Sequence, residues 1–275
     1  MLSQLRKRGI NMENKRLIEL VNVSKDYDGD VALNNINLYI RDGEFLTLLG
    51  PSGCGKTTTL RMIAGFESPD EGEIYINGKP VSISSPKESF HLGIGMIHQH
   101  FKLVDVFTAA ENIILGLDEK LDMKSAIRKI RKICDQYGFD IDPNQKIYDM
   151  SVSQKQTIEI IKVLYRGADI LILDEPTAVL TPQETDKLFA ILRNMRNAGK
   201  AIVIITHKMH EVEDLSDRVA ILRHGQFVGD MLTRETNAQE MTNMMVGRPV
   251  TLNIDRPAPL SLIHISEPTR QEAIS

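Results

Sequence analysis

The segment GPSGCGKT, from Gly50 to Thr57, has the residue types and the spacing of a phosphate-binding loop. Its glycines let successive backbone N–H groups turn inward around phosphate oxygens, and the N-terminus of a following helix adds positive potential. Lys56 would reach the β- and γ-phosphates of a nucleotide, and the Thr57 hydroxyl would bind Mg²⁺. The alternative is a glycine-rich turn that contains a lysine by chance.

The residues around this segment favour the nucleotide site over that alternative. An apolar strand-like run, FLTLLG, leads into the loop, and a helix-compatible stretch, TTTLRMIAG, leads out of it, so strand, loop and helix follow one another in the required order. The residues predicted to bind the nucleotide here are Gly50, Pro51, Ser52, Gly53, Cys54, Gly55, Lys56, Thr57 and Thr58.

Two carboxylates follow a second apolar run, in the segment ILILDEPT. A buried strand that ends in acids carries negative charge at its tip. Beside a bound nucleotide, Asp174 would hold Mg²⁺, and Glu175 would orient or deprotonate the attacking water. The alternative is an ordinary strand end whose acids simply face solvent. The phosphate-binding loop upstream argues against that alternative.

A histidine follows a third run, in IVIITHKMHE. A single histidine at a strand end is usually structural. Here the strand is expected to lie beside the acidic one in a parallel sheet, and ligands collect at the carboxyl ends of such strands. We therefore predict that His207 contacts the γ-phosphate.

The elements that must position these residues can be predicted from the apolar pattern. The runs ILIL and IVIIT are apolar on both faces, as buried parallel strands are, and PQETDKLFAILRNMRNAG is helical between them, with Pro182 near its start and Gly199 past its end. That is a βαβ unit. LIELVNV and INLYI alternate like half-exposed strands, EIYINGKP adds another strand with an Asn-Gly turn, and residues 103–166 have helical spacing.

Composition excludes several other classes of protein. The 275 residues include 33 basic and 37 acidic side chains, and a net charge of −4 offers no general basis for wrapping nucleic acid. Two cysteines are too few for a disulfide framework and fit a reducing compartment. No run approaches the roughly 20 apolar residues that span a bilayer. We therefore expect a cytosolic protein with no nucleic-acid partner.

Both ends of the sequence lack a core-forming pattern. Residues 1–14 are polar and basic and are expected to be a leader, with Met12 an alternative start. Residues 251–275 are expected to be a linker remnant, in which LSLIHISEPTR, from Leu260 to Arg270, is similar to the translation of a sequencing-library adapter. Residues 15–250 would then form the folded domain.

Taken in order, Tyr27, GPSGCGKT, Gln99, MSVSQ, ILILDEPT and ITH resemble the motifs of an ABC transporter nucleotide-binding domain, over residues 16 to about 248. The resemblance implies an α/β fold of the P-loop ATPase type, with an N-terminal antiparallel β subdomain and a helical subdomain at about residues 90–165. It also implies ATP and Mg²⁺ as ligands and ATP hydrolysis coupled to transport.

The resemblance assigns further roles by position. Tyr27 matches the aromatic residue that stacks on adenine, and Gln99 matches the glutamine that touches Mg²⁺ and the attacking water. Ser151 and Gln154, in MSVSQ, match the signature LSGGQ, whose serine opens a helix and binds the γ-phosphate of ATP held by a facing domain. Taken alone, Ser151 could equally be an ordinary helix N-cap.

Four positions depart from the family pattern. Val152 and Ser153 replace the two glycines of the signature, Thr157 stands where arginine is common, and Thr181 occupies the position of a usual aspartate. Similar changes occur in the sugar and nucleoside importers of the family, whose ATPase is two such domains fused in one chain. Ser153 is unusual even there, and we expect it to weaken the contribution of this half to the partner's site.

The resemblance is strongest to the first ATPase half of nucleoside importers, through IHQHFKLVDVFTAAENIILG and YRGADILILDEPTAVLTPQE. It implies transmembrane permease subunits, a second ATPase half and, indirectly, a substrate-binding lipoprotein as partners, at the inner face of the cell membrane. A ribose-type or other simple-sugar importer is the alternative substrate class. A soluble ABC protein without a transporter, or a regulatory half that does not hydrolyse ATP, is the alternative of another class.

Overall fold

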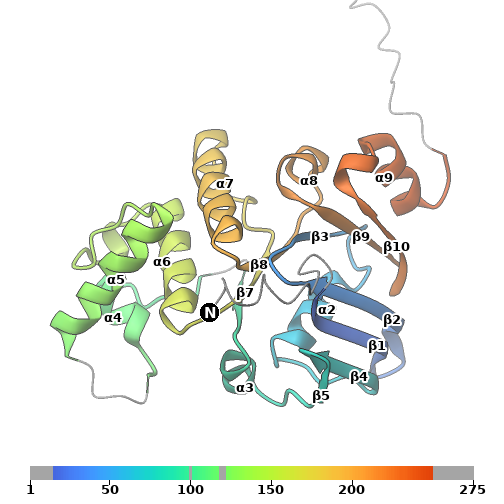
Figure 1. The fold of residues 1–275 in the computed structure, drawn as a ribbon, viewed down its shortest axis with the longest axis horizontal. Helices are drawn as coiled ribbons and strands as arrows, with labels where there is room; N and C mark the ends of the chain where they lie inside the picture. Colours follow the sequence, from blue (N-terminus) through green and yellow to red (C-terminus); the bar gives the residue numbers. More distant parts are fainter. Residues whose placement is uncertain (1–14, 99–100, 118–121, 250–275) are drawn as a thin grey trace, which may run out of the picture.

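The computed structural model describes residues 15–98, 101–117 and 122–249. The first of its two sheets has four strands and is antiparallel (Figure 1). The strand order is β2-β1-β4-β5. Asp28 and Gly29 join the first two strands, and Asn77 and Gly78 join the last two; all four have positive φ, as tight two-residue hairpin turns require. The predicted small antiparallel sheet is confirmed. Its strands are β1 (Arg16–Tyr27), β2 (Asp30–Arg41), β4 (Glu71–Ile76) and β5 (Lys79–Val81).

The second sheet has six strands in the order β10-β9-β3-β8-β7-β6. All neighbouring pairs are parallel except β10–β9 at one edge. The predicted βαβ unit is confirmed, because β7 and β8 are neighbours and α7 (Pro182–Asn197) connects them. The strands are β3 (Phe45–Leu49), β6 (Ile94–Ile97), β7 (Ile170–Asp174), β8 (Ala201–Ile205), β9 (Arg218–Arg223) and β10 (Gln226–Leu232).

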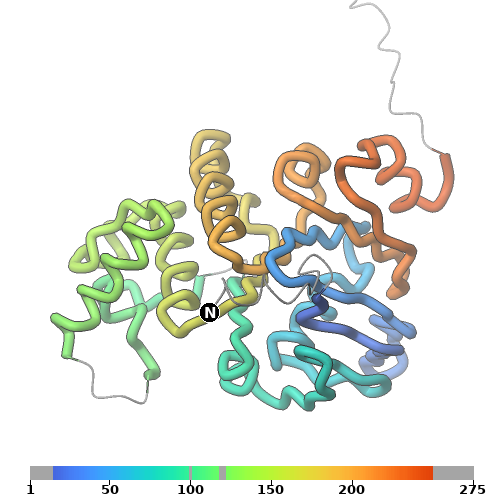
Figure 2. The backbone as a smooth tube through the Cα atoms, in the orientation of Figure 1, coloured from blue at the N-terminus to red at the C-terminus, as the bar shows by residue number. Residues whose placement is uncertain are grey.

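Helices α4, α5 and α6 lie together on the side of the molecule away from the antiparallel sheet (Figures 1 and 2). The segment expected to be helical, residues 90–165, also contains β6, which pairs with β7 in the six-stranded sheet. Besides α7, the helices in the described residues are α2 (Lys56–Ile63), α3 (Pro86–His91), α4 (Ala109–Ile114), α5 (Met123–Tyr137), α6 (Val152–Tyr165), α8 (Met209–Leu215) and α9 (Ala238–Val246), with 3-10 turns at Ile147–Asp149 and Thr233–Glu235.

The parallel strands of the six-stranded sheet are buried on both faces, as their continuous apolar runs predicted, whereas the edge strand β10 is not. Alternate residues of β7 belong to two separate clusters: Leu171 and Leu173 pack with the helices, whereas Ile170 and Ile172 pack with α2 and the antiparallel sheet. Burial on both sides fixes the register of the strand, and with it the position of the acids that follow.

Helices α6 and α7 both begin with a capping box. Ser151 caps α6 together with Gln154, and Thr181 caps α7 together with Glu184. Each cap pairs two backbone N–H groups with side-chain oxygens and so defines where its helix begins. None of the helices in the described ranges is both long enough and apolar enough to cross a membrane.

Candidate active site

Three adjacent strands bring the predicted chemistry together. In the six-stranded sheet β8 lies between β3 and β7. The loop after β3 leads to Lys56 at the start of α2, the loop after β8 carries His207, and the loop after β7 carries Glu175. Because the three strands are parallel, all three loops leave the same edge of the sheet. Sequence reasoning therefore placed these residues at one edge correctly.

The phosphate-binding loop wraps around the Lys56 side chain. Its Nζ donates to the carbonyl oxygens of Gly50 at 2.7 Å and Pro51 at 2.8 Å, and it lies 3.5 Å from Cys54 Sγ. Gly55 caps α2 in the left-handed conformation, and a Cβ there would lie 2.3 Å from Leu33 Cδ2. Only glycine fits, so the loop holds the cation at the start of α2, where a phosphate group would bind.

Asp174 and Thr57 are paired across the sheet edge. The Thr57 hydroxyl donates to Asp174 Oδ2 at 3.3 Å, which joins the first turn of α2 to the end of β7. Burial raises the pKa of Asp174 above its ordinary value, and the hydrogen bond from Thr57 partly opposes that rise. A partly buried carboxylate and a hydroxyl are oxygen donors that suit Mg²⁺, so this pair fits the metal role predicted for both residues.

Glu175 stands at a strained position directly after β7. Its φ of 45° is unusual for a residue with a side chain, and its N–H donates to the carbonyl of Ile205 on β8 at 3.1 Å. The carboxylate Oε1 lies 3.3 Å from His207 Nδ1. Two of the three residues predicted to be catalytic, Glu175 and His207, therefore contact each other, and the side chain of His207 is mostly exposed.

A buried carboxylate, Glu211, holds the Glu175 and His207 loops together. Its two oxygens accept hydrogen bonds of 2.6 Å from the hydroxyls of Thr177 and Thr206, which lie two residues after Glu175 and one before His207. Lys208 Nζ is 3.1 Å from the same carboxylate. Sequence reasoning missed Glu211; the signal was an acid in the first turn of the helix that follows the histidine.

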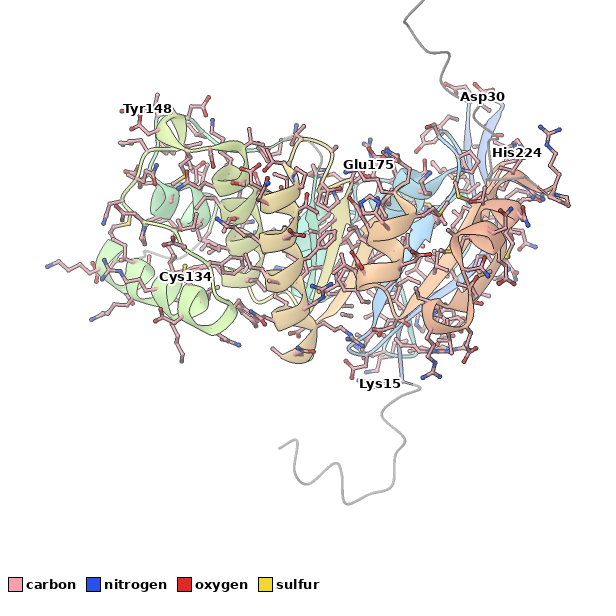
Figure 3. All side chains as sticks on the ribbon, turned by 90° about the horizontal axis from the view of Figure 1, so that it is seen from above. Lys15, Asp30, Cys134, Tyr148, Glu175 and His224 are labelled. Carbon is pink, nitrogen blue, oxygen red and sulfur yellow. The ribbon has the colours of Figure 1, made fainter. Side chains whose placement is uncertain are left out.

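The positions assigned by resemblance are less closely grouped. Tyr27 ends β1 and is 41% exposed, and its partner Asp30 lies toward the same side of the molecule as Glu175 (Figure 3). Ala32 and Leu33 of β2 lie against Gly55, so the hairpin that carries Tyr27 is next to the phosphate-binding loop. Gln99 lies outside the described residues.

Ser151 and Gln154 are engaged in capping α6. Ser151 Oγ accepts from the Gln154 N–H at 3.3 Å, and Gln154 Oε1 accepts from the Ser151 N–H at 2.9 Å. One turn later, buried Gln156 donates to the carbonyl of Pro176 at 2.7 Å and so ties α6 to the loop after Glu175. In the described part of the chain, the side-chain hydrogen bonds found for Ser151 all lie within its own segment.

Replacing Asp174 with asparagine should stabilise the nucleotide-free protein at neutral pH. An acid with a raised folded-state pKa contributes stability that is present below its unfolded pKa and is lost as pH rises through the folded pKa. The asparagine side chain would keep an acceptor for Thr57 without the buried charge. We expect the melting temperature of Asp174→Asn to be a few degrees higher than that of the wild type at neutral pH and no higher in acid. Mg²⁺ should no longer strengthen the binding of ATP to this variant. A lower melting temperature at neutral pH would contradict this assignment.

Several proteins named as import ATP-binding proteins are similar to most of this chain. A nucleoside import ATP-binding protein of Lactococcus lactis is 43% identical over 90% of this chain and 50% of its own length. A guanosine import ATP-binding protein of Bacillus subtilis is 46% identical over 88% of this chain and 48% of its own. A ribose import ATP-binding protein of Yersinia pestis is 35% identical over 96% and 54%. The chain thus spans about half the length of these relatives.

Solved structures share the fold. An ATP-binding cassette of an ABC transporter in its ADP conformation has a TM-score of 0.74 at 22% identity, over 85% of this chain and 96% of that one. A bacterial ABC transporter cassette solved as a dimer has a TM-score of 0.69 at 28% identity, over 79% and 99%. The ABC transporter family model matches residues 33–178, more than half of the sequence, and on that match the chain belongs to the ABC transporter family.

Proposed function

We propose that this chain is the ATP-binding and ATP-hydrolysing part of an importer. The observation that carries the proposal is the cluster at one sheet edge, in which a loop-bound lysine, a Thr57–Asp174 pair and a Glu175–His207 pair lie on adjacent strands. A cation, oxygen ligands for a metal, and a carboxylate next to a histidine are the groups that phosphoryl transfer to water needs.

Each residue would have a separate role in hydrolysis. Lys56 would leave the loop carbonyls and bind the β- and γ-phosphates, while loop N–H groups surround the phosphate oxygens. Thr57 and Asp174 would hold Mg²⁺, which neutralises phosphate charge when bound. Glu175 would accept a proton from the attacking water, and His207, held beside it, would contact the γ-phosphate. Tyr27 would stack on adenine.

The proposed substrate class is nucleosides. The two relatives named for nucleoside and guanosine import are 43% and 46% identical to this chain, whereas the relative named for ribose import is 35% identical. Import of ribose or another simple sugar is the second candidate, because its relatives match over the same region. The residues that hydrolyse ATP do not touch the transported molecule, so only these likenesses bear on the choice.

A groove between α3 and the helical part of the chain is the proposed contact for the permease subunits. Its volume is about 690 Å³, and Phe90, Leu117 and Tyr165 line it together with Lys129 and Arg166. The Arg166 guanidinium lies 5.2 Å from the centre of the Phe90 ring, and Lys129 Nζ lies 4.0 Å from that of Tyr165. An apolar floor with a cationic rim suits a short permease segment at the inner face of the membrane. A substrate-binding lipoprotein would act through the permeases.

Co-expression with permease subunits of a nucleoside importer tests the proposal. The full-length protein should co-purify with them, and cells should take up labelled nucleosides in preference to ribose, because the likenesses favour that class. Lys56→Ala should abolish uptake while leaving the complex assembled, since it removes a phosphate contact and not a docking residue. Uptake that Lys56→Ala does not change, or a protein that never associates with the permeases, would contradict the importer function.

A further inference from the structure

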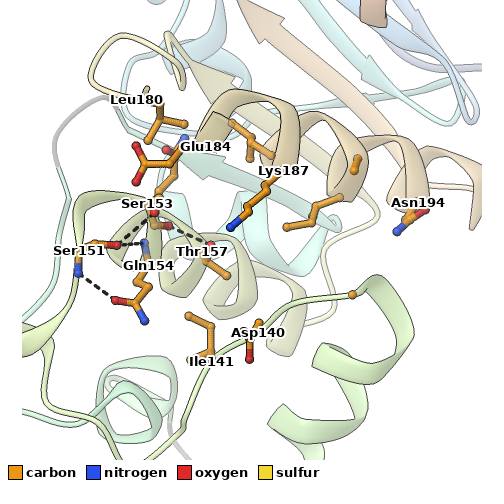
Figure 4. A pocket seen from close by; sticks show the side chains of 15 residues that line it. Asp140, Ile141, Ser151, Ser153, Gln154, Thr157, Leu180, Glu184, Lys187 and Asn194 are labelled. Atoms are coloured by element: carbon orange, nitrogen blue, oxygen red, sulfur yellow. Dashed lines mark hydrogen bonds between the residues drawn. The ribbon is translucent and has the colours of Figure 1, made fainter. Parts of the chain in front are cut away.

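Gln156 is a buried polar residue one turn into α6, and its side chain reaches the loop that carries Glu175. It is 4% exposed, and its Nε2 donates to the carbonyl of Pro176 at 2.7 Å. It lines the pocket of about 590 Å³ between α6 and α7 (Figure 4) and also a small cavity beside Asp174 and Glu175. The amide therefore lies between the helix and the carboxylates of the site.

The partner fixes the direction of this hydrogen bond. A backbone carbonyl can only accept, so the NH₂ end of the Gln156 amide must face Pro176. This leaves Gln156 Oε1 buried, and it has no hydrogen-bond partner among the residues that the structure describes. A methionine has about the same length and would leave no such oxygen, so packing and hydrogen-bond balance do not account for an amide here. What the amide adds is a donor aimed at one carbonyl.

Glu175 has a backbone conformation that needs to be held from outside. Its φ of 45° lies in the left-handed region, which a residue with a Cβ rarely adopts, and the proline that follows it favours an extended conformation instead. Such a residue keeps its conformation only where the surrounding structure holds it. When a restraint is lost, the backbone at Glu175 relaxes and its carboxylate leaves its place beside His207.

Other hydrogen bonds hold this loop from the sheet and from α8. The carbonyl of Ile205 on β8 accepts from the Glu175 N–H at 3.1 Å, and the Glu211 carboxylate on α8 accepts from the Thr177 hydroxyl at 2.6 Å. Gln156 holds the loop from a different element, α6, which begins at the signature serine. The position of the loop therefore depends on α6 as well as on the sheet.

We propose that Gln156 is a positioning residue for hydrolysis, whose amide N–H holds the Pro176 carbonyl and thereby keeps the Glu175 carboxylate in place for the attacking water. The inference rests on the proposed function, in which Glu175 accepts a proton from that water. A shift of α6 moves the Pro176 carbonyl through the same contact, so the place of Glu175 follows the helix. The phosphate-binding loop follows a different strand, β3, so the binding of ATP does not depend on this contact.

The test compares Gln156→Met with the wild type in the full chain. A second ATPase half of a nucleoside importer is supplied in excess, with its own glutamate at the position of Glu175 changed to glutamine, so that the released phosphate comes from this chain. We expect kcat to fall about tenfold, the effect of roughly one hydrogen bond, while the Kd for a fluorescent ATP analogue stays within about twofold. Thermal melts should show no loss of stability, because methionine also removes the unpartnered oxygen.

The matched control is Thr157→Val at the next position of the same helix. It removes a hydroxyl that donates to the Ser153 carbonyl at 2.9 Å, within α6 itself. Both kcat and Kd should stay within about twofold of the wild type, because this hydroxyl does not hold the Glu175 loop. Gln156→Leu, which also lacks a donor, takes the place of Gln156→Met if the methionine chain does not fold.

A double variant separates positioning through Glu175 from a general effect on the fold. In a Glu175→Gln chain the carboxylate that Gln156 positions is already gone, so adding Gln156→Met should change the remaining turnover by less than about twofold. The inference is overturned by a Gln156→Met chain with wild-type kcat, by a loss of ATP binding in that chain, or by the same tenfold loss in both backgrounds. A wild-type chain that releases no phosphate with the second half overturns the proposed function itself.

Discussion

Glu175→Gln is expected to bind ATP as tightly as the wild type and to hydrolyse it roughly 10²- to 10⁴-fold more slowly. Glutamine has the same shape as glutamate and keeps an oxygen that can face His207 Nδ1, now 3.3 Å from the carboxylate. It cannot accept a proton from water. Lys56, proposed to bind the phosphates, and Thr57, proposed to bind Mg²⁺, lie at the start of α2 and not beside Glu175 in the chain, so binding should be unchanged.

Lys56→Ala is the matched control, because it should weaken nucleotide binding itself. The lysine is buried in the loop, with Nζ bonded to carbonyl groups that a phosphate would replace in the proposed mechanism. Equilibrium binding of a fluorescent ATP analogue and release of phosphate must be measured separately, so that the two effects are not confused. Wild-type turnover by Glu175→Gln would show that another group activates the water.

The parts of the site that could be predicted from the sequence are those whose chemistry is local along the chain. The phosphate-binding loop combines glycine freedom, a lysine and a helix start within eight consecutive positions, Gly50 to Thr57. Asp174 is the last residue of a strand whose apolar run is buried on both faces, and His207 follows another such strand, so their place at a common edge follows from sheet topology.

The parts that could not be predicted depend on side chains from separate elements. Glu211 is an acid in an ordinary helix turn until the fold brings Thr177 and Thr206 to its two oxygens. In the same way, Gln156 is one polar residue of a helix until the fold brings the carbonyl of Pro176 to its side-chain amide. No local spacing encodes either contact, because the partners are joined only by packing.

The position of Ser151 leads to the second large effect, which concerns how many chains make one working site. Lys56, Asp174, Glu175 and His207 gather at one sheet edge, whereas Ser151 is bonded within its own segment at the start of α6. By resemblance to the family, the signature serine serves the nucleotide of a facing domain. On the proposed function, one chain would bind ATP by itself but would lack the facing serine at the γ-phosphate.

We therefore expect the isolated chain to bind Mg-ATP as a monomer and to hydrolyse it slowly, with specific activity that rises with protein concentration. Donors already in place around developing charge are worth roughly 10²- to 10³-fold in rate each, so a monomer that lacks the facing serine should lose about that factor. Self-pairing supplies a serine, but it places Ser153 and the half-exposed Val152 at both sites, so the recovered activity should remain weak. Specific activity is measured over a range of chain concentrations, with and without a separately supplied second ATPase half, and that half should restore fast turnover at low concentration. Fast turnover that does not depend on concentration would mean that the γ-phosphate is fully surrounded by one chain, and that Ser151 serves only as the cap of α6.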